Sequence, residues 1–400
     1  FLHDTAVPRS DPWLLVAVGI GIMAAVAVVV CRPWDLADGF MIGTPVGRDF
    51  ANLWLAGTLA LSGGLDLLVD PAAYEALFAR TFAHNPGDTF IYSYPPHSLL
   101  FMAPLAMLPL GLAVCIWTLI NLACIERSVR LLQADWKIGA AACLSPAALS
   151  MVAFGHFGGM LAFLGVYVLT QAERRPLLAG ACLALMSVKP HIAAVFGLLL
   201  LFTGRWRPLL WAVPATLLLV AASVLAFGIR PWVNFVTWTV PFHSQLVSGS
   251  GVGALGMVVS IYAGLLLAGV PGWLAQAAQC AFGILLLAKA VQLLKRHGAE
   301  PRPLALVMLA SLAALPYVNS YDLAIAAPAL TVAIFDRKHP PFLPGWSGWL
   351  MWLLPALAIP LGIMRVPLVQ PVFALLLLVA LFGLRTLPRT SLSRAAPAGP

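Results

Sequence analysis

The chain has 400 residues, of which 61% are hydrophobic and only 10% are charged. Because a soluble domain carries about 25% charged residues, the composition excludes an ordinary soluble protein and predicts an all-α polytopic membrane protein. The formal net charge is +8. The basic residues fall in short segments between apolar runs, where they indicate membrane topology and no nucleic-acid partner. The six cysteines lie in or beside apolar runs without metal-binding spacing, so we expect small core residues and no disulfides.

Apolar runs divide the chain into about twelve predicted spans. Pro104 and Pro109 are expected to kink or shorten the second of them. The interval around Lys189-Pro190-His191 predicts two short helices, or a re-entrant hairpin, with a charged apex. The run 257–270 is too short to span and is expected to be interfacial or re-entrant. The predicted spans are 13–31, 98–124, 138–154, 160–171, 176–188, 192–202, 208–228, 273–294, 303–316, 323–335, 346–364 and 371–384.

We expect one integral-membrane domain over 1–385 and a disordered cytoplasmic tail over 386–400. Two long intervals, 32–97 and 229–272, are predicted extracytoplasmic loops. With the N-terminus in the cytoplasm, most of the 23 lysines and arginines fall on the cytoplasmic side, as the positive-inside rule requires. The same topology gathers several unusual polar residues on the opposite rim, which suits an enzyme better than a transporter with a midplane site. These are Asp49, His97, His156, Lys189, His191, His243 and Asp322.

Arg48-Asp49-Phe50 begins a predicted helix in the first long loop. Phe50, Leu53 and Trp54 follow helical spacing, as on a helix lying at the membrane interface. Asp49 would occupy the first turn of that helix, where it could act as a general base or only as an N-cap. The other acidic residues of the loop are expected to serve solvation and helix capping. They are Asp66, Asp70, Glu75 and Asp88.

Lys189 is the cation predicted to lie at depth in the membrane, which costs about 2.5–3.5 kcal/mol on insertion scales. A phosphate partner would offset that cost, with His191 as a second donor. Arg48 could also stabilise such a phosphate. The alternative is that Lys189 only extends toward the interface.

Three further motifs lie at span boundaries. Tyr94-Pro95-Pro96-His97 predicts a rigid entry turn from which His97 binds a ligand, and Gly155 to Gly159 predicts a turn that allows close approach around His156. Asp322, in Asn319-Ser320-Tyr321-Asp322, could pair with Lys189, bind a sugar hydroxyl or cap the following span. Four residues of the second loop could form a wall that stacks on a sugar: Trp232, Trp238, His243 and Gln245.

No Walker A, Rossmann or DXD-type motif is present, so a soluble nucleotide-sugar donor is not favoured. In their order and spacing the motifs resemble glycosyltransferase family 87 over roughly residues 45–340. The matching residues are Arg48-Asp49-Phe50, Trp54-Ala56-Gly57, Tyr94-Pro95-Pro96, Pro104-Leu105, Leu108-Pro109, Trp117, Gly155-His156-Gly158, Lys189-Pro190-His191 and Asn319-Ser320-Tyr321-Asp322.

The resemblance implies a C-type glycosyltransferase fold and a polyprenyl-phosphate sugar donor, usually mannose. Transfer with inversion is then expected on the periplasmic face of a bacterial inner membrane. The acceptor would be a lipid or a glycan, with Asp49 at the position of the family's base. Neither metal nor cofactor is required. We expect Lys189, His191 and Arg48 at the donor phosphate. Residues expected at the sugar or acceptor are Tyr94, His97, His156, Asn319, Tyr321 and Asp322. Two alternatives stay open: a lipid or glycan transporter, and an O-antigen-ligase-like enzyme with a diphosphate-linked donor.

Overall fold

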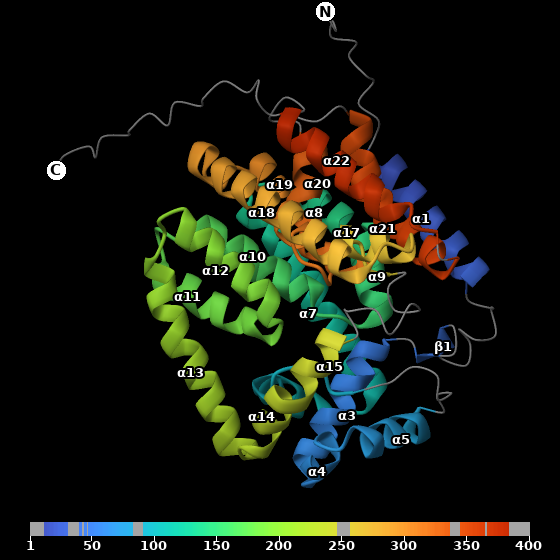
Figure 1. Ribbon diagram of the computed structural model, residues 1–400, viewed down its shortest axis with the longest axis vertical. Helices are drawn as coiled ribbons and strands as arrows, with labels where there is room; N and C mark the ends of the chain where they lie inside the picture. The colour runs from blue at the N-terminus through green and yellow to red at the C-terminus, as the bar shows by residue number, and fades with distance from the viewer. Residues whose placement is uncertain are drawn as a thin grey trace, which may run out of the picture.

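The computed structural model describes residues 12–30, 40–41, 44–45, 47–82, 91–245, 257–336, 345–364 and 366–383. Asp88 and the predicted tail 386–400 lie outside them. The described chain is almost entirely helical (Figure 1). Its first half contains β1 Phe40–Met41, paired antiparallel with β2 Thr44–Pro45, and the helices α1 Pro12–Val30, α3 Arg48–Ser62, α4 Leu65–Leu68, α5 Pro71–Thr81, η1 Pro96–Ser98, α6 Leu99–Ala106, α7 Leu110–Leu131, α8 Trp136–Cys143, α9 Pro146–Phe154, α10 Gly158–Gln171, α11 Pro176–Leu185, η2 Met186–Val188 and α12 Pro190–Phe202.

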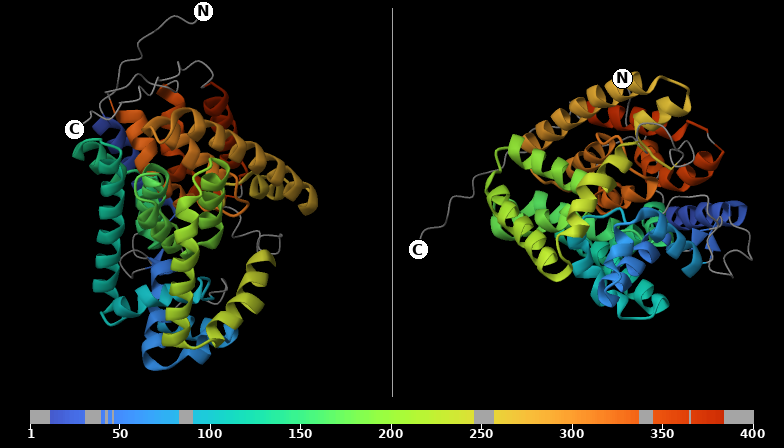
Figure 2. Two further views of the ribbon diagram at one scale, coloured as in Figure 1. Left: turned by 90° about the vertical axis from the view of Figure 1, so that its left-hand side faces the viewer. Right: turned by 60° about the horizontal axis from the view of Figure 1, so that its bottom comes forward.

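The second half continues the helical bundle. Figure 2 shows α13 descending along one side to α14 and α15, which lie at the same end of the molecule as α3, α4 and α5. Its helices are α13 Arg207–Phe227, α14 Arg230–Asn234, the π-helical turn η3 Phe235–Thr239, α15 Val240–Gln245, α17 Ile261–Leu267, α18 Gly272–His297, α19 Pro301–Ala313, η5 Ser320–Ile325, α20 Ala327–Phe335, α21 Gly345–Ile363 and α22 Val369–Gly383.

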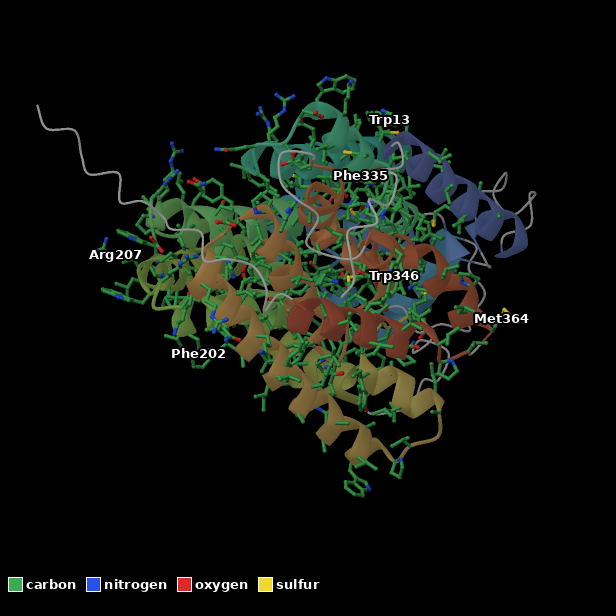
Figure 3. All side chains as sticks on the ribbon, turned by 90° about the horizontal axis from the view of Figure 1, so that it is seen from above. Trp13, Phe202, Arg207, Phe335, Trp346 and Met364 are labelled. Carbon is green, nitrogen blue, oxygen red and sulfur yellow. The ribbon has the colours of Figure 1, made fainter. Side chains whose placement is uncertain are left out.

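Three described helices, α7, α13 and α18, are long and apolar enough to cross a membrane, and the bent pair α8–α9 would make a fourth. Helix α13 leaves large apolar side chains uncovered along its length, with Leu218 70% and Leu225 89% exposed. Such surface is tolerated in lipid and disfavoured in water. Figure 3 places Phe202 and Arg207, at the turn into α13, on one edge of the bundle and Met364 on the opposite edge. These features are those of a membrane protein.

Two predicted single spans are broken helices. The run 98–124 divides at Pro109, which lacks an amide hydrogen and has the extended ψ of 141°, so α6 ends and α7 begins there. The run 138–154 divides into α8 and α9 with a bend of 52° at Ser145-Pro146. The prediction of two short helices that meet near Lys189 is confirmed. Helix α11 continues into η2, which ends at Val188, and α12 begins at Pro190.

The predicted loop over 229–256 is partly helical, since α14, η3 and α15 occupy 230–245. Further along, the run 257–270 contains only the seven-residue α17. Before α17 the chain is extended, and Val258 pairs with Asn319 in an isolated antiparallel bridge. The expectation that this run does not form a spanning helix is therefore confirmed for the described residues. The bridge also fastens the segment to the start of η5.

Helix α3 differs from the predicted interfacial helix. Its side chains Phe50 and Leu53 are fully buried, and it packs closely along α6. A Cβ on Gly57 would lie 2.8 Å from the Met102 carbonyl oxygen, so the two helices approach backbone to backbone. The apolar spacing was read correctly, but the surface that it covers is protein and not lipid.

Several elements pack closely against the turn 155–159. Gly155 has the left-handed φ of 70°, and a Cβ there would lie 2.7 Å from the Phe50 Cβ. A Cβ on Gly159 would lie 2.2 Å from the Asn121 carbonyl oxygen, and one on Gly158 would meet Ala324 at 2.9 Å. Glycine is required where backbones approach this closely. The turn therefore brings α3, α7 and η5 together around one point.

The five described cysteines are free. The expectation of core burial is wrong for Cys115 and Cys280, which are exposed on α7 and α18. Both helices are candidate spans, and a thiol is apolar enough to face lipid.

Candidate active site

The centre of the site is an ion pair between residues 133 positions apart. Lys189 Nζ donates to Asp322 Oδ1 at 2.7 Å. Lys189 occupies the junction between η2 and α12, and Asp322 belongs to η5. The Asp322 side chain is 1% exposed and the Lys189 side chain 10%. A pairing of these two residues was one of the alternatives predicted for Asp322, and the structure confirms it.

Local geometry holds Asp322 firmly. Asn319 is the N-cap of η5, and the two residues form a capping box in which the Asn319 amide donates to Asp322 Oδ2 at 3.0 Å. His156 Nδ1 lies 3.6 Å from Asp322 Oδ1. With Lys189 on one oxygen and a backbone amide on the other, the carboxylate is engaged on both sides. The alternative that Asp322 caps the following span is wrong, because the N-cap of η5 is Asn319, with Asp322 at the third helical position of its capping box, and the N-cap of α20 is Ala326.

Asp49 lies in the first turn of α3. The N-cap residue is Gly47, in a left-handed conformation with no side-chain cap, so the alternative that Asp49 is the N-cap is wrong. Arg48 Nε lies 3.3 Å from Asp49 Oδ1, and the guanidinium lies over the Phe154 ring at 5.0 Å from its centroid. The side chains of Arg48 and Asp49 are 20% and 16% exposed. They are more accessible than the buried Lys189–Asp322 pair.

Tyr321 lies near both acidic residues. Its hydroxyl accepts from Asn319 Nδ2 at 3.0 Å, and burial together with the charges of Asp49 and Asp322 raises its pKa. Burial raises the pKa of Asp49 above its usual 3.8, although Arg48, Lys189 and the Tyr321 hydroxyl each oppose the rise. A carboxylate in such surroundings binds a proton more readily than one in water, which suits a general base.

Asp322 has the opposite balance. Burial alone would raise its pKa, but Lys189, His156 and the hydrogen bond from the Asn319 amide together lower it. Burial and the neighbouring Lys189 lower the pKa of His156 well below its usual value. The cluster thus combines two basic side chains, an imidazole of lowered pKa and two carboxyl groups whose pKa values shift in opposite directions. Carboxylates whose surroundings push their pKa values apart have different roles.

Aromatic rings pack beside the charged residues of the cluster. The centroid of the Tyr321 ring lies 4.6 Å from that of His156 and 5.1 Å from that of Phe154. Phe157 packs against Tyr94 at 5.1 Å. Burial raises the pKa of Tyr94, and the charges of Asp49 and Asp322 raise it further, so the ring lies within electrostatic range of both carboxylates. The expected sugar-binding residues Tyr94, His156 and Tyr321 therefore meet at one place.

The remaining predicted residues divide into two groups. Burial lowers the pKa of His191 and of His243, and the charge of Lys189 lowers both further, so both lie within electrostatic range of the ion pair. His97 instead contacts Ser187 Oγ at 3.1 Å and stacks on Trp232. The predicted sugar-stacking wall is not continuous among the described side chains. Trp238 stacks on Phe242, and the side chain of Gln245 lies outside the description.

Sequence reasoning missed three contributors. Phe154 lies beneath Arg48. Tyr317 hydrogen-bonds with Asn319 and lies within electrostatic range of Asp322 and Asp49, but the predicted motif begins only at Asn319. Ser187 binds His97. The position of Tyr317, two residues before Asn319 at the same span boundary, was a usable signal; Phe154 and Ser187 lie in apolar runs and gave none.

These features define a helical membrane protein with a part-buried site of paired cations and carboxylates. The sequence model of glycosyltransferase family 87 matches residues 92–318. The chain belongs to this family, and it is a glycosyltransferase. The matched region contains His156, Lys189 and His191, whereas Asp49 precedes it and Asp322 follows it. No curated protein and no solved structure matches the chain.

Proposed function

We propose that the protein transfers a hexose, which the family resemblance implies is mannose, from a polyprenyl-phosphate donor to a lipid or glycan acceptor, with inversion. Asp49 removes the proton of the acceptor hydroxyl, whose oxygen forms the new bond to the anomeric carbon. The bond from that carbon to the phosphate oxygen breaks, and polyprenyl phosphate leaves. The observation that carries this proposal is the position of Asp49: a part-exposed carboxylate of raised pKa beside two cations.

The leaving phosphate gains negative charge, so cations that are already in place stabilise the transition state. Arg48 presents a planar fork of N–H donors that suits phosphate oxygens. Lys189 has three N–H donors, and Asp322 takes one of them. We assign His191 to the same phosphate because it lies beside Lys189. A metal is not needed for this step.

Asp322 has a different role from the sugar contact expected at first. Both of its oxygens are engaged by Lys189 and by the Asn319 amide, so we assign it to holding Lys189. The residues left for sugar and acceptor hydroxyls are Tyr94, His97, His156, Asn319 and Tyr321. Their hydroxyl, imidazole and amide groups are the usual partners of sugar hydroxyls.

We further propose a C-type glycosyltransferase fold of about twelve spans within residues 1–385, with 32–97 and 229–272 at the extracytoplasmic side. The protein would reside in a bacterial inner membrane with its site facing the periplasm. The distribution of lysine and arginine supports this orientation. Access to a membrane-anchored donor supports the location.

The test is transfer of labelled mannose from polyprenyl-phosphate mannose in membranes that contain the full chain. We expect Asp49→Asn to reduce kcat by about 10²–10⁴-fold, the usual contribution of general base catalysis. Asp66→Asn is the matched control: Asp66 is exposed and pairs with Arg230, so transfer should be unchanged.

Normal transfer by Asp49→Asn would refute its role as the base. Transfer from a diphosphate-linked donor, with none from the monophosphate, would favour the ligase-like reaction. Uptake of a lipid or glycan without any transfer would favour a transporter.

A further inference from the structure

The imidazole of His97 has a defined tautomer. Ser187 Oγ donates its single proton to the Ala184 carbonyl at 2.5 Å, and it also lies 3.1 Å from His97 Nε2. Because the hydroxyl proton is already engaged, Ser187 can only accept from His97. Nε2 therefore carries a hydrogen. Burial lowers the pKa of His97 to about 4, so the ring is neutral at pH 7 and Nδ1 keeps a lone pair.

This Nδ1 atom is buried and has no hydrogen-bond partner among the described residues. His97 itself is 2% exposed. An unsatisfied buried acceptor is unfavourable, so an atom of this kind calls for a partner, such as a water molecule, an ion or a ligand. A neutral acceptor has no proton to give a phosphate oxygen. The partner that fits is a hydrogen-bond donor, and a sugar hydroxyl is the donor that this class of substrate supplies.

Trp232 stacks on one face of the His97 ring. The two rings stack with centroids 5.8 Å apart and an interplanar angle of 17°. Trp232 Nε1 in turn donates to Ser223 Oγ at 2.9 Å. His97 is thus fixed between α14 and η2, and Ser187 lies two residues before the proposed phosphate-binding Lys189.

We propose that Ser187 is a positioning residue that holds His97 in the Nε2–H tautomer, so that Nδ1 accepts a hydrogen bond from a substrate hydroxyl. The hydroxyl belongs either to the transferred sugar or to the acceptor. This inference rests on the proposed function. It separates His97 from the phosphate-binding residues and makes it a determinant of sugar or acceptor specificity.

Two substitutions of His97 separate its nitrogens. His97→Asn keeps a polar group near Nδ1 and loses the contact to Ser187. His97→Gln keeps a group near Nε2 and loses the Nδ1 acceptor. We expect His97→Gln to lower kcat/KM by about tenfold, as the loss of one hydrogen bond to substrate would, and His97→Asn to lower it less. Equal losses in the two variants, or a greater loss in His97→Asn, would overturn the assignment of Nδ1.

Without the Ser187 hydroxyl, in the Ser187→Ala variant, His97 should populate both of its neutral tautomers. Nitrogen NMR of the full chain in lipid nanodiscs, with labelled histidine, reads this directly, and the His97→Asn spectrum identifies the His97 signals. We expect the Nε2–H form in the wild type, a mixture in Ser187→Ala and restoration in Ser187→Thr. Ser128→Ala is the control, because Ser128 is buried in α7 and donates to its own helix at Cys124. A wild-type Nδ1–H tautomer would overturn the proposal whether or not transfer is observed.

Deoxy substrates identify the hydroxyl. Each donor that lacks one sugar hydroxyl, and an acceptor that lacks its neighbouring hydroxyl, is assayed with wild type and His97→Gln. For the substrate that lacks the bound hydroxyl, the difference between the two proteins should vanish. If the difference persists with every substrate, Nδ1 binds no hydroxyl. Failure of the proposed function would look different, because the wild type itself would then transfer no sugar.

Discussion

Two of the apolar stretches that break at a proline, at Ser145-Pro146 and at Lys189-Pro190, break differently. Between α8 and α9, Ser145 precedes Pro146; its hydroxyl donates to the Ala142 carbonyl at 2.7 Å and accepts from the Ala148 amide at 3.3 Å. Between η2 and α12, Lys189 precedes Pro190 and gives the helix no side-chain cap. Its ammonium instead reaches Asp322. The first break satisfies its own backbone, and the second supplies a charge to a distant element.

The two breaks differ in whether the residue before the proline is the one that helix capping favours. A serine N-cap is the favoured solution at a helix start, and the break at Ser145 adopts it. A lysine in that position is worse for the helix, and it requires a partner elsewhere in the fold. Sequences depart from the locally favoured residue mainly at functional sites. The break at Lys189 is therefore the one to associate with chemistry.

The strongest test of this contrast is removal of the charge. Lys189→Met leaves the Asp322 carboxylate buried without its cation, which we expect to lower the free energy of unfolding by about 3–5 kcal/mol and to abolish transfer. The midpoint of thermal unfolding in detergent measures the first effect.

The double variant Lys189→Met/Asp322→Asn removes both charges and keeps an acceptor for the Asn319 amide. It should recover most of the lost stability but none of the activity. Recovery of activity in the double variant would show that Lys189 only serves the fold.

A second prediction concerns the pKa of Asp49, which depends on the positive charges of Arg48 and Lys189. Arg48 and Lys189 both hold the pKa of Asp49 down, while burial raises it. Arg48→Gln removes one cation, so the pKa should rise further and the acid limb of kcat/KM should move to higher pH. The base works only when ionised, so activity at a given acidic pH falls. The pH profile of transfer checks this, with Arg230→Gln as the surface control; a limb that stays in place would exclude Asp49 as the titrating group.

The smallest expected effect belongs to the other break. Ser145→Ala removes a helix cap, which costs about 1 kcal/mol, and transfer should stay at the wild-type rate. Thermal unfolding and the transfer assay are measured on the same preparation. A loss of transfer without a loss of stability would mean that both breaks serve the site.

Much of the fold could be predicted because proline and glycine mark helix ends locally. The turn at Gly155 and the break at Lys189-Pro190 were both located from such marks. Burial could not be read in the same way, because α3 has the apolar spacing of either a lipid-facing or a core helix. The segment 230–245 was mistaken for loop, since its mixed aromatic and polar residues give no clear helical period.

The candidate site was predictable in its charged members. Isolated charges such as Asp49, Lys189 and Asp322 stand out in an apolar chain because each needs a partner. Their pairing could be suggested, since the topology placed them on one side, but not decided, because distance along the chain carries no geometry. The contact of Ser187 with His97 could not be predicted, because a serine in an apolar helix usually hydrogen-bonds to the backbone of its own helix.

The separation of Lys189 from Asp322 also concerns how the protein is made. The two residues lie 133 positions apart, and synthesis proceeds at about 5–20 residues per second. The nascent chain therefore carries Lys189 for on the order of 10 s before its counterion exists. Until then, water or another polar group must solvate the ammonium of Lys189. The ion pair that joins Lys189 to η5 can therefore form only after η5 has been synthesised.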